Sequence, residues 1–319
     1  MKIVSLFSGA GGLDLGLQRA GHELIWANDI DKDAVETYRH NIGHHVVLAD
    51  IADLADGDVP KGEVVVGGFP CQGFSLANLR RSGDDTRNKL YLQFLRVVTV
   101  TRPLYFIAEN VRGILSLESG DAIKKIVSDF SSAGYRVNYE LFNAADFGVP
   151  QSRLRVIIAG TRNDLPTSAD FQFPVPTHSK KPKGNLFPWV SISEGLKEVP
   201  DPDIYPLTVP NQNYSRYKVT NRNFTGHRTT DPSKACPTIL ARGDGGGGVC
   251  AIQHPRNHRR LSVRESAALQ TFPLNFKFFG AMNSQYRQVG NAVAVKFAEQ
   301  IGLSLTHAAQ QLGHLRKVA

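Results

Sequence analysis

The chain contains little cysteine and no long hydrophobic run. Its 319 residues include only 3 cysteines, none of them paired at the spacing of a zinc site, so we expect neither a disulfide framework nor a structural metal. The first apolar residues give way to Ser8 and Gly9 too soon for a signal peptide. No stretch approaches membrane-spanning length. These absences predict a soluble, cytoplasmic protein with no bound metal and no membrane partner.

Positive charge, in contrast, is concentrated in one region. The net charge is +8, and residues 180–260 hold 13 Lys and Arg against 6 Asp and Glu, which accounts for nearly all of the excess. A polyanion such as nucleic acid is the natural partner of such a region. On charge alone, a solvated basic surface explains the count equally well.

The N-terminal half alternates apolar segments with amphipathic ones, which predicts an α/β fold with a doubly wound, parallel sheet. The expected strands are residues 2–7, 23–27, 45–49, 64–66, 104–108, 135–142 and 154–160. The expected helices include 13–20, 90–100, 122–132, 263–271 (after a capping box opened by Ser262) and 292–312. Nine of the 17 prolines fall in residues 166–210, which marks the end of the sheet. We therefore predict two domains, residues 1–165 plus 286–319 and a smaller irregular domain at 166–285.

Special residues follow the ends of five successive predicted strands: Gly9, Asp29, Asp50, Cys71 and Glu109. Ligands bind at the carboxyl edge of an open α/β sheet, so we expect these residues to form one site. The glycine loop at 8–12 lies between a strand and a helix, which is the context of a nucleotide-type loop. Asp29 follows the first loop glycine by 20 residues, where an acid binds ribose hydroxyls. Helix N-capping is an alternative role for Asp29 and Asp50, and both roles can coexist.

Cys71 lies in the loop that ends a strand of three valines. Gly67, Gly68 and Pro70 stop that strand and leave the thiol at its carboxyl end. Cysteine is the most nucleophilic side chain near neutral pH, especially where amides and arginines lower its pKa. A buried structural cysteine is the usual alternative for a lone cysteine. The acid expected beside it, Glu109, favours a catalytic role.

A thiolate beside an acid suits the covalent activation of a pyrimidine ring. Addition of the Cys71 thiolate at C6 makes C5 nucleophilic enough to attack a methyl sulfonium. Negative charge develops on the ring, and a protonated Glu109 at N3 would stabilise it. Arg153 or Arg155 would hold the carbonyl oxygen O2 through a charge-assisted hydrogen bond. The sequence does not indicate which base removes the C5 proton.

In this order, the motifs resemble those of the DNA (cytosine-5) methyltransferases of the bacterial modification type, over nearly the whole chain. The motifs that carry the resemblance are Phe7-Ser8-Gly9-Ala10-Gly11-Gly12, Pro70-Cys71-Gln72, Glu109-Asn110-Val111, Gln151-Ser152-Arg153-Leu154-Arg155 and Gly290-Asn291-Ala292-Val293. The resemblance implies a Rossmann-like methyltransferase sheet that uses S-adenosylmethionine, with Cys71, Glu109, Arg153 and Arg155 as catalytic residues. The cofactor-binding residues that it implies are Phe7, Gly9, Gly11, Gly12, Asp29, Ile30, Asp50, Ile51, Pro70, Leu90, Asn291 and Ala292.

The resemblance also implies that double-stranded DNA is the substrate and that the target cytosine is flipped out of the duplex, because C6 cannot meet the thiol inside the base stack. It places target recognition between the Gln-x-Arg-x-Arg element and the helix at Arg264, the span that carries the excess charge. The DNA-contacting residues that we expect are Ser75, Arg80, Arg81, Thr238 and Arg242. A solvated turn is the alternative for Arg80 and Arg81. We expect a nucleoid-associated monomer with a cognate restriction endonuclease.

Three rival functions remain open from the sequence. Relatives with the same motifs methylate cytosine in transfer RNA, although Pro70-Cys71-Gln72 and the long basic segment favour DNA. A nicotinamide-dependent oxidoreductase would share the glycine loop but has no use for Cys71, Glu109 and Arg155 together. A DNA-binding protein without catalytic activity would be expected to have lost the nucleophile or the acid, and both are present.

Overall fold

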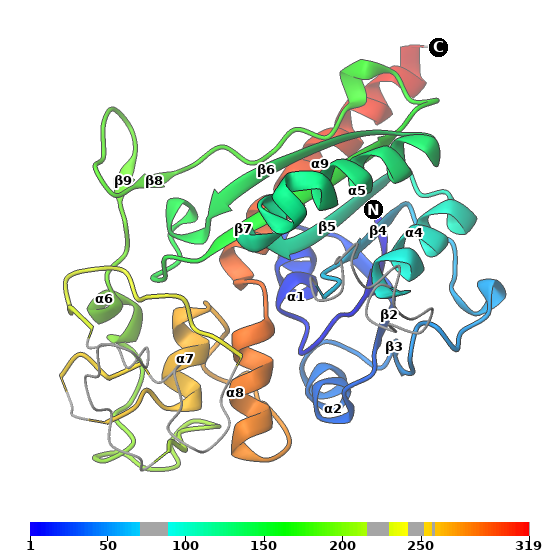
Figure 1. The fold of residues 1–319 in the computed structure, drawn as a ribbon. Helices are drawn as coiled ribbons and strands as arrows, with labels where there is room; N and C mark the ends of the chain where they lie inside the picture. Colours follow the sequence, from blue (N-terminus) through cyan, green and yellow to red (C-terminus); the bar gives the residue numbers. More distant parts are fainter. Residues whose placement is uncertain (71–88, 216–229, 242–251, 257–258, 319) are drawn as a thin grey trace.

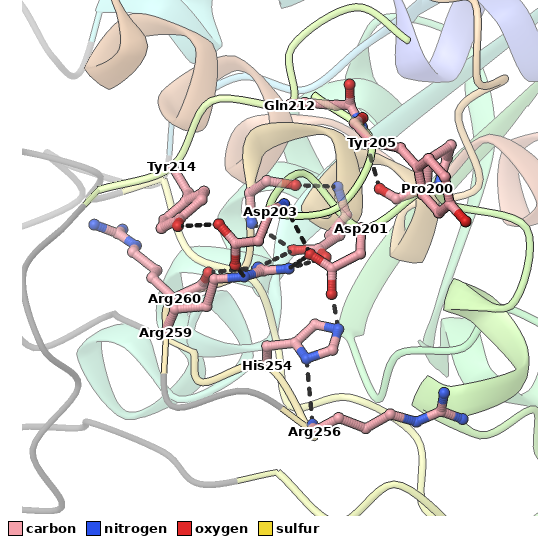
Figure 2. A network of polar contacts seen from close by, with 12 residues as sticks. Pro200, Asp201, Asp203, Tyr205, Gln212, Tyr214, His254, Arg256, Arg259 and Arg260 are labelled. Atoms are coloured by element: carbon pink, nitrogen blue, oxygen red, sulfur yellow. Dashed lines mark hydrogen bonds and ion pairs between the residues drawn. The ribbon is translucent and has the colours of Figure 1, made fainter. Parts of the chain in front are cut away.

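A seven-stranded sheet forms the frame of the protein. The computed structural model describes residues 1–70, 89–215, 230–241, 252–256 and 259–318 (Figure 1). The strands are β1 (Lys2–Leu6), β2 (Glu23–Asp29), β3 (Val46–Leu48), β4 (Val64–Gly67), β5 (Tyr105–Val111), β6 (Tyr135–Asn143) and β7 (Leu154–Arg162). Their order is β3-β2-β1-β4-β5-β7-β6, with β1 to β5 parallel and β7 antiparallel to both neighbours. The predicted α/β fold is confirmed.

Helices cover both faces of the sheet (Figure 1). Helices α1 (Gly12–Arg19) and α9 (Val295–Val318) lie on one face, and α4 (Lys89–Thr101) and α5 (Asp121–Ser132) lie on the other, while α2 (Lys32–Asn41) packs beside β2 and β3. In β4, Val64 and Val66 pack with the first pair of helices, whereas Val65 packs with the second. Because both faces are covered, every position of this strand is apolar instead of every second one.

The second region of the chain has short elements. They are β8 (His178–Ser179), β9 (Phe187–Pro188), α6 (Ile192–Leu196), α7 (Val263–Leu269) and α8 (Met282–Asn291), of which the helices lie together in Figure 1. The 3-10 helices among the described residues are η1 (Asp56–Asp58), η2 (Arg112–Leu115), η3 (Leu117–Gly120), η4 (Ala144–Phe147) and η5 (Thr167–Ala169). None of the helices in the described ranges is both long enough and apolar enough to span a membrane.

Two predicted boundaries were wrong in ways that matter for the site. Strand β5 does not stop at residue 108 but continues through Glu109 to Val111, because these residues go on pairing with β7 as far as Arg155. The last predicted helix begins at Val295 instead of residue 292. Helix α8 ends at Asn291, and residues 292–294 connect it to α9.

The capping box at Ser262 was predicted correctly. The Ser262 hydroxyl accepts a hydrogen bond from the Glu265 N–H, and the Glu265 carboxylate accepts one from the Ser262 N–H at 2.7 Å. The division into two domains stays a prediction. In the packing, Phe171 belongs to the core on the α1 and α9 face of the sheet, and Tyr286 packs with the residues around α7.

Candidate active site

A cavity of about 500 Å³ lies at the carboxyl ends of β1, β2, β4 and β5, and the C-terminal end of α8 closes one side of it. The expected cofactor residues that line it are Phe7, Gly9, Gly12, Asp29, Ile30, Asp50, Ile51, Pro70, Leu90, Asn291 and Ala292. Gly11 is not among the lining residues. It precedes α1 with a φ of 84°, and a Cβ there would lie 2.1 Å from Ile42 Cδ1, so glycine is required for the turn.

Asp29 anchors the glycine loop to the end of β2. Its carboxylate oxygens accept hydrogen bonds from the backbone N–H groups of Gly9 and Asp31, each at 2.8 Å. Burial raises the pKa of Asp29, although these hydrogen bonds oppose the shift. The N-cap of α2 is Asp31, which accepts from the N–H groups of Asp33 and Ala34. The capping alternative for Asp29 is therefore wrong, and its carboxylate is part of the cavity wall.

Asp50 and Arg287 also line the cavity. Asp50 accepts a hydrogen bond from the Ala52 N–H at 2.9 Å, in the turn that follows β3. Arg287, from α8, forms an ion pair with Asp31 at 2.7 Å, so a side chain from each side of the cavity contributes to the contact. The wall therefore combines carboxylates and backbone amides, groups that suit a nucleoside.

A carboxylate that the sequence did not single out lies behind the glycine loop. Asp14, in the first turn of α1, is fully buried and lines the cavity. It accepts hydrogen bonds from Ser5 Oγ at 2.7 Å and from the Tyr38 hydroxyl at 2.8 Å, and Tyr38 also lies 3.0 Å from His45 Nε2. Burial raises the pKa of Asp14 to about 6. An acid in a first helical turn is usually explained by the helix dipole, so no signal in the sequence reveals this burial.

Glu109 and Arg155 meet at the inner end of the cavity. The Arg155 Nε atom lies 2.5 Å from Glu109 Oε1, which makes an ion pair. The angle at the N–H does not fit a hydrogen bond, however, and neither atom has another hydrogen-bond partner among the described residues. Both side chains are 11% exposed. A nearly buried acid and a nearly buried guanidinium are therefore paired in the wall of the cavity.

Asn110 holds the loop that leads to Cys71. Its side-chain Nδ2 donates to the Phe69 carbonyl oxygen at 3.0 Å, and its Oδ1 accepts from the Val111 N–H at 2.9 Å. Asn110 is buried, and the Phe69 ring packs against Tyr91 and Phe94. The sequence motif contains Asn110, but the sequence analysis assigned it no function. It fixes the backbone at Phe69, two residues before Cys71 in the chain.

Of the two arginines that the sequence left open for the carbonyl oxygen O2, the structure favours Arg155. Arg153 does not line the cavity, and it is fully buried. Its Nη1 donates to the Ile239 carbonyl oxygen at 2.9 Å, and its Nη2 donates to the Gly290 carbonyl oxygen at 2.8 Å. In a strand, side chains two residues apart lie on the same face of the sheet. Arg153 precedes the start of β7, so this rule does not place its side chain on the same face as that of Arg155.

A second, more open cavity of about 520 Å³ adjoins the first, and Arg155 and Val111 line both. Its other walls include Arg112 and Thr238. The Thr238 hydroxyl donates to the Ser152 carbonyl oxygen at 2.8 Å, which fixes this segment against the start of β7. Five residues with predicted roles lie outside the described residues: Cys71, Ser75, Arg80, Arg81 and Arg242.

Comparisons with known proteins agree with this geometry. A family model described as C-5 cytosine-specific DNA methylase matches residues 1–307. The type II methyltransferase M.NgoFVII of Neisseria gonorrhoeae is 37% identical over 95% of this chain and 86% of its own length. The type II methyltransferase M.FnuDI of Fusobacterium nucleatum is 35% identical over 93% of this chain and 92% of its own. The crystal structure of the S. pombe Dnmt2 methyltransferase shares the fold, with a TM-score of 0.71, 22% identity, and coverage of 96% of this chain and 99% of that one.

Proposed function

The chain belongs to the C-5 cytosine-specific DNA methylase family and is a DNA cytosine-5 methyltransferase, and we propose that it methylates one specific double-stranded sequence by flipping out the target cytosine. The observation that carries this proposal is the Glu109–Arg155 ion pair, because it joins an acid in the first cavity to an arginine that lines both cavities. The type II methyltransferases among its relatives support a role as the modification enzyme of a restriction-modification system, beside a cognate endonuclease.

The first cavity fits S-adenosylmethionine. Its volume of about 500 Å³ is in the range of small-molecule sites, and Asp29 offers a carboxylate at the end of β2, where ribose hydroxyls bind in such folds. Asp50 and Ile51 would contact the adenine, and Asn291 and Ala292 would cover the methionine end. When bound, the cofactor supplies a methyl group on a sulfonium. The chain's own side chains bind and orient it and keep water from it.

The second cavity is the proposed entrance for the flipped base. A pyrimidine that passes Val111 would reach Glu109 and Arg155, whose carboxyl and guanidinium groups suit N3 and O2 of the ring. The Cys71 thiolate would add to C6, Glu109 would donate a proton at N3, and Arg155 would hold O2. After the methyl group has transferred to C5, loss of the C5 proton to a base re-forms the C5–C6 double bond and expels the thiolate, and the N3 proton returns to Glu109.

Two features support the position of the nucleophile in this mechanism. Cys71 directly follows Pro70, which lines the first cavity beside the end of β5. The Asn110 side chain ties the carbonyl of Phe69 to the strand that carries Glu109. Two adjacent parallel strands, β4 and β5, therefore bring the thiol-bearing loop and the acid to one edge.

The test is bisulfite sequencing of random duplex DNA after incubation with the protein and S-adenosylmethionine. We expect conversion-resistant cytosines at one short recurring sequence, and none with Cys71→Ser. Parallel reactions with transfer RNA address the rival substrate. Methylated transfer RNA together with unmodified duplex DNA would reject the proposed substrate, and full activity of Cys71→Ser would reject the proposed nucleophile.

A further inference from the structure

Three buried polar side chains, Gln151, Arg153 and Gln270, join the walls of the two cavities, and we refer to them as the clamp. On one side the clamp holds both backbone groups of Ile239. Arg153 Nη1 donates to the Ile239 carbonyl oxygen at 2.9 Å, and Gln151 Oε1 accepts from the Ile239 N–H at 2.9 Å. The residues on either side of Ile239 line the second cavity. The wall through which we expect DNA to approach is therefore fixed to these side chains.

On its other side the clamp holds the end of α8, which lines the cofactor cavity. Arg153 Nη2 donates to the Gly290 carbonyl oxygen at 2.8 Å, and Gln270 Nε2 donates to the Ala292 carbonyl oxygen at 3.2 Å. Gln151 Nε2 donates to Gln270 Oε1 at 3.0 Å, which gives a second connected route across the joint. Gly290 and Ala292 both line the first cavity.

The two walls also touch directly. A Cβ on Gly290 would lie 2.4 Å from both the Leu240 carbonyl carbon and the Ala241 nitrogen. The backbone of α8 therefore lies against the backbone of residues 240–241 with no side chain between them. Close-packed segments of this kind shift together instead of deforming continuously.

Arginine is the side chain that this joint requires. Its planar guanidinium donates to two carbonyl oxygens in fixed directions, whereas a lysine ammonium is a compact donor without that fork. Burial without a carboxylate partner is costly for a guanidinium, and the Arg153 Nε has no hydrogen-bond partner among the described residues. A residue with that cost is better explained by a bridge between two sites than by packing.

We propose that Arg153, with Gln151 and Gln270, is a positioning clamp through which an occupied cofactor cavity orders the DNA-facing wall at residues 238–240. The inference rests on the proposed function, since it takes the first cavity as the cofactor site and the second as the DNA side. Coupling of this kind is reciprocal, so bound DNA must tighten cofactor binding by the same factor.

The test measures hydrogen exchange, by mass spectrometry, of the peptide at residues 236–241 with and without saturating S-adenosylhomocysteine. In the wild-type protein we expect the cofactor product to slow exchange of this peptide by about tenfold, within the usual range of coupling between sites. Arg153→Lys should still bind S-adenosylhomocysteine but lose most of that slowing. Gln270→Glu keeps the acceptor for Gln151 but cannot donate to the end of α8, so it should lose part of the slowing. This variant replaces Arg153→Lys in the test if Arg153→Lys does not fold.

Arg162→Lys is the matched control, because Arg162, the last residue of β7, also donates to a backbone carbonyl, that of Arg102, at 2.6 Å. It should keep the full effect. Equal slowing in the clamp variants and the wild type would overturn the inference, as would a wild-type peptide unaffected by a ligand that binds. If calorimetry detects no binding of S-adenosylhomocysteine to the wild-type protein, the proposed function itself fails.

Discussion

The backbone of Gly68 lies against the carboxylate of Glu109, so closely that a Cβ on Gly68 would be 3.1 Å from Glu109 Oε2. Gly68 is three residues before Cys71 in the chain. The carboxylate and the segment that leads to Cys71 are thus neighbours in the described part of the structure. A side chain at position 68 would require the Glu109 carboxylate to shift by a few tenths of an ångström.

Glu109→Gln tests the acid in this pair. Glutamine keeps the shape of glutamate but cannot protonate the ring, so the methyl-transfer rate should fall by about 10²–10⁴-fold, the usual contribution of a general acid. Single-turnover methylation of duplex DNA measures the rate, and calorimetry should show little change in S-adenosylhomocysteine affinity. Glu140→Gln, on the exposed part of edge strand β6, is the control. A rate within threefold of wild type would contradict the role of Glu109.

Asp29→Asn tests the anchor of the glycine loop. The Asp29 carboxylate accepts from two backbone amides and is the group proposed to bind the ribose. A hydrogen bond to a charged group contributes roughly 1.5–3 kcal/mol, so the affinity for S-adenosylhomocysteine should fall by about ten- to a hundredfold. Calorimetry provides the measurement. Asp121→Asn, at the start of α5 and away from the cavity, should bind normally. An unchanged affinity in Asp29→Asn would remove this residue from the site.

Much of the site could be predicted because its residues follow the ends of strands that are adjacent in the sheet. Gly9 and Asp50 come after β1 and β3, Asp29 is the last residue of β2, and parallel pairing brings these strand ends to one edge. Local chemistry also predicted the capping box at Ser262. In these cases a short stretch of sequence contains the whole physical cause.

Other features depend on contacts between distant segments, which no local pattern records. Arg153 and Arg155 are two residues apart and look equivalent in the sequence, yet only Arg155 begins to pair with β5. The burial of Asp14 depends on Tyr38 from another helix. The insertion of β7 between β5 and β6 likewise depends on tertiary pairing instead of chain order.

Asp14→Asn tests the consequence of that buried carboxylate. The pKa of Asp14 rises from 3.8 to about 6 on folding because burial disfavours the charged form. The folded state therefore binds the proton more tightly than the unfolded state, and this group makes the protein less stable as the pH rises from about 4 to 6. Above pH 6 the full cost, on the order of 3 kcal/mol, is present.

Asparagine at position 14 removes that charge. Its amide can still accept from Ser5 and can donate to the Tyr38 hydroxyl, which can turn its own proton toward His45. Relative to wild type, the variant should gain more unfolding free energy at pH 7 than at pH 4.5, as measured by urea denaturation at both pH values. Asp121→Asn corrects for general effects of removing a carboxylate. A gain that is the same at both pH values would show that Asp14 is not the titrating group.

Gly290→Ala tests the close contact between α8 and residues 240–241. Alanine is the better helix former by about 1 kcal/mol, so a free position in α8 would be stabilised by the change. Here the Cβ would lie 2.4 Å from backbone atoms, which cannot rotate away as a side chain can. Overpacking costs roughly 1–3 kcal/mol, so the clash should outweigh the gain in helix propensity.

We expect Gly290→Ala to lower the free energy of unfolding by about 1–2 kcal/mol and to weaken S-adenosylhomocysteine binding, because Gly290 lines the cofactor cavity. Thermal or urea denaturation and calorimetry measure the two effects. Gly57→Ala is the matched control, since a Cβ at Gly57 would have no heavy atom within 4 Å. If Gly290→Ala proved as stable as this control, the two walls would have more freedom to separate than the structure indicates, and direct backbone contact could not be part of the joint between the cavities.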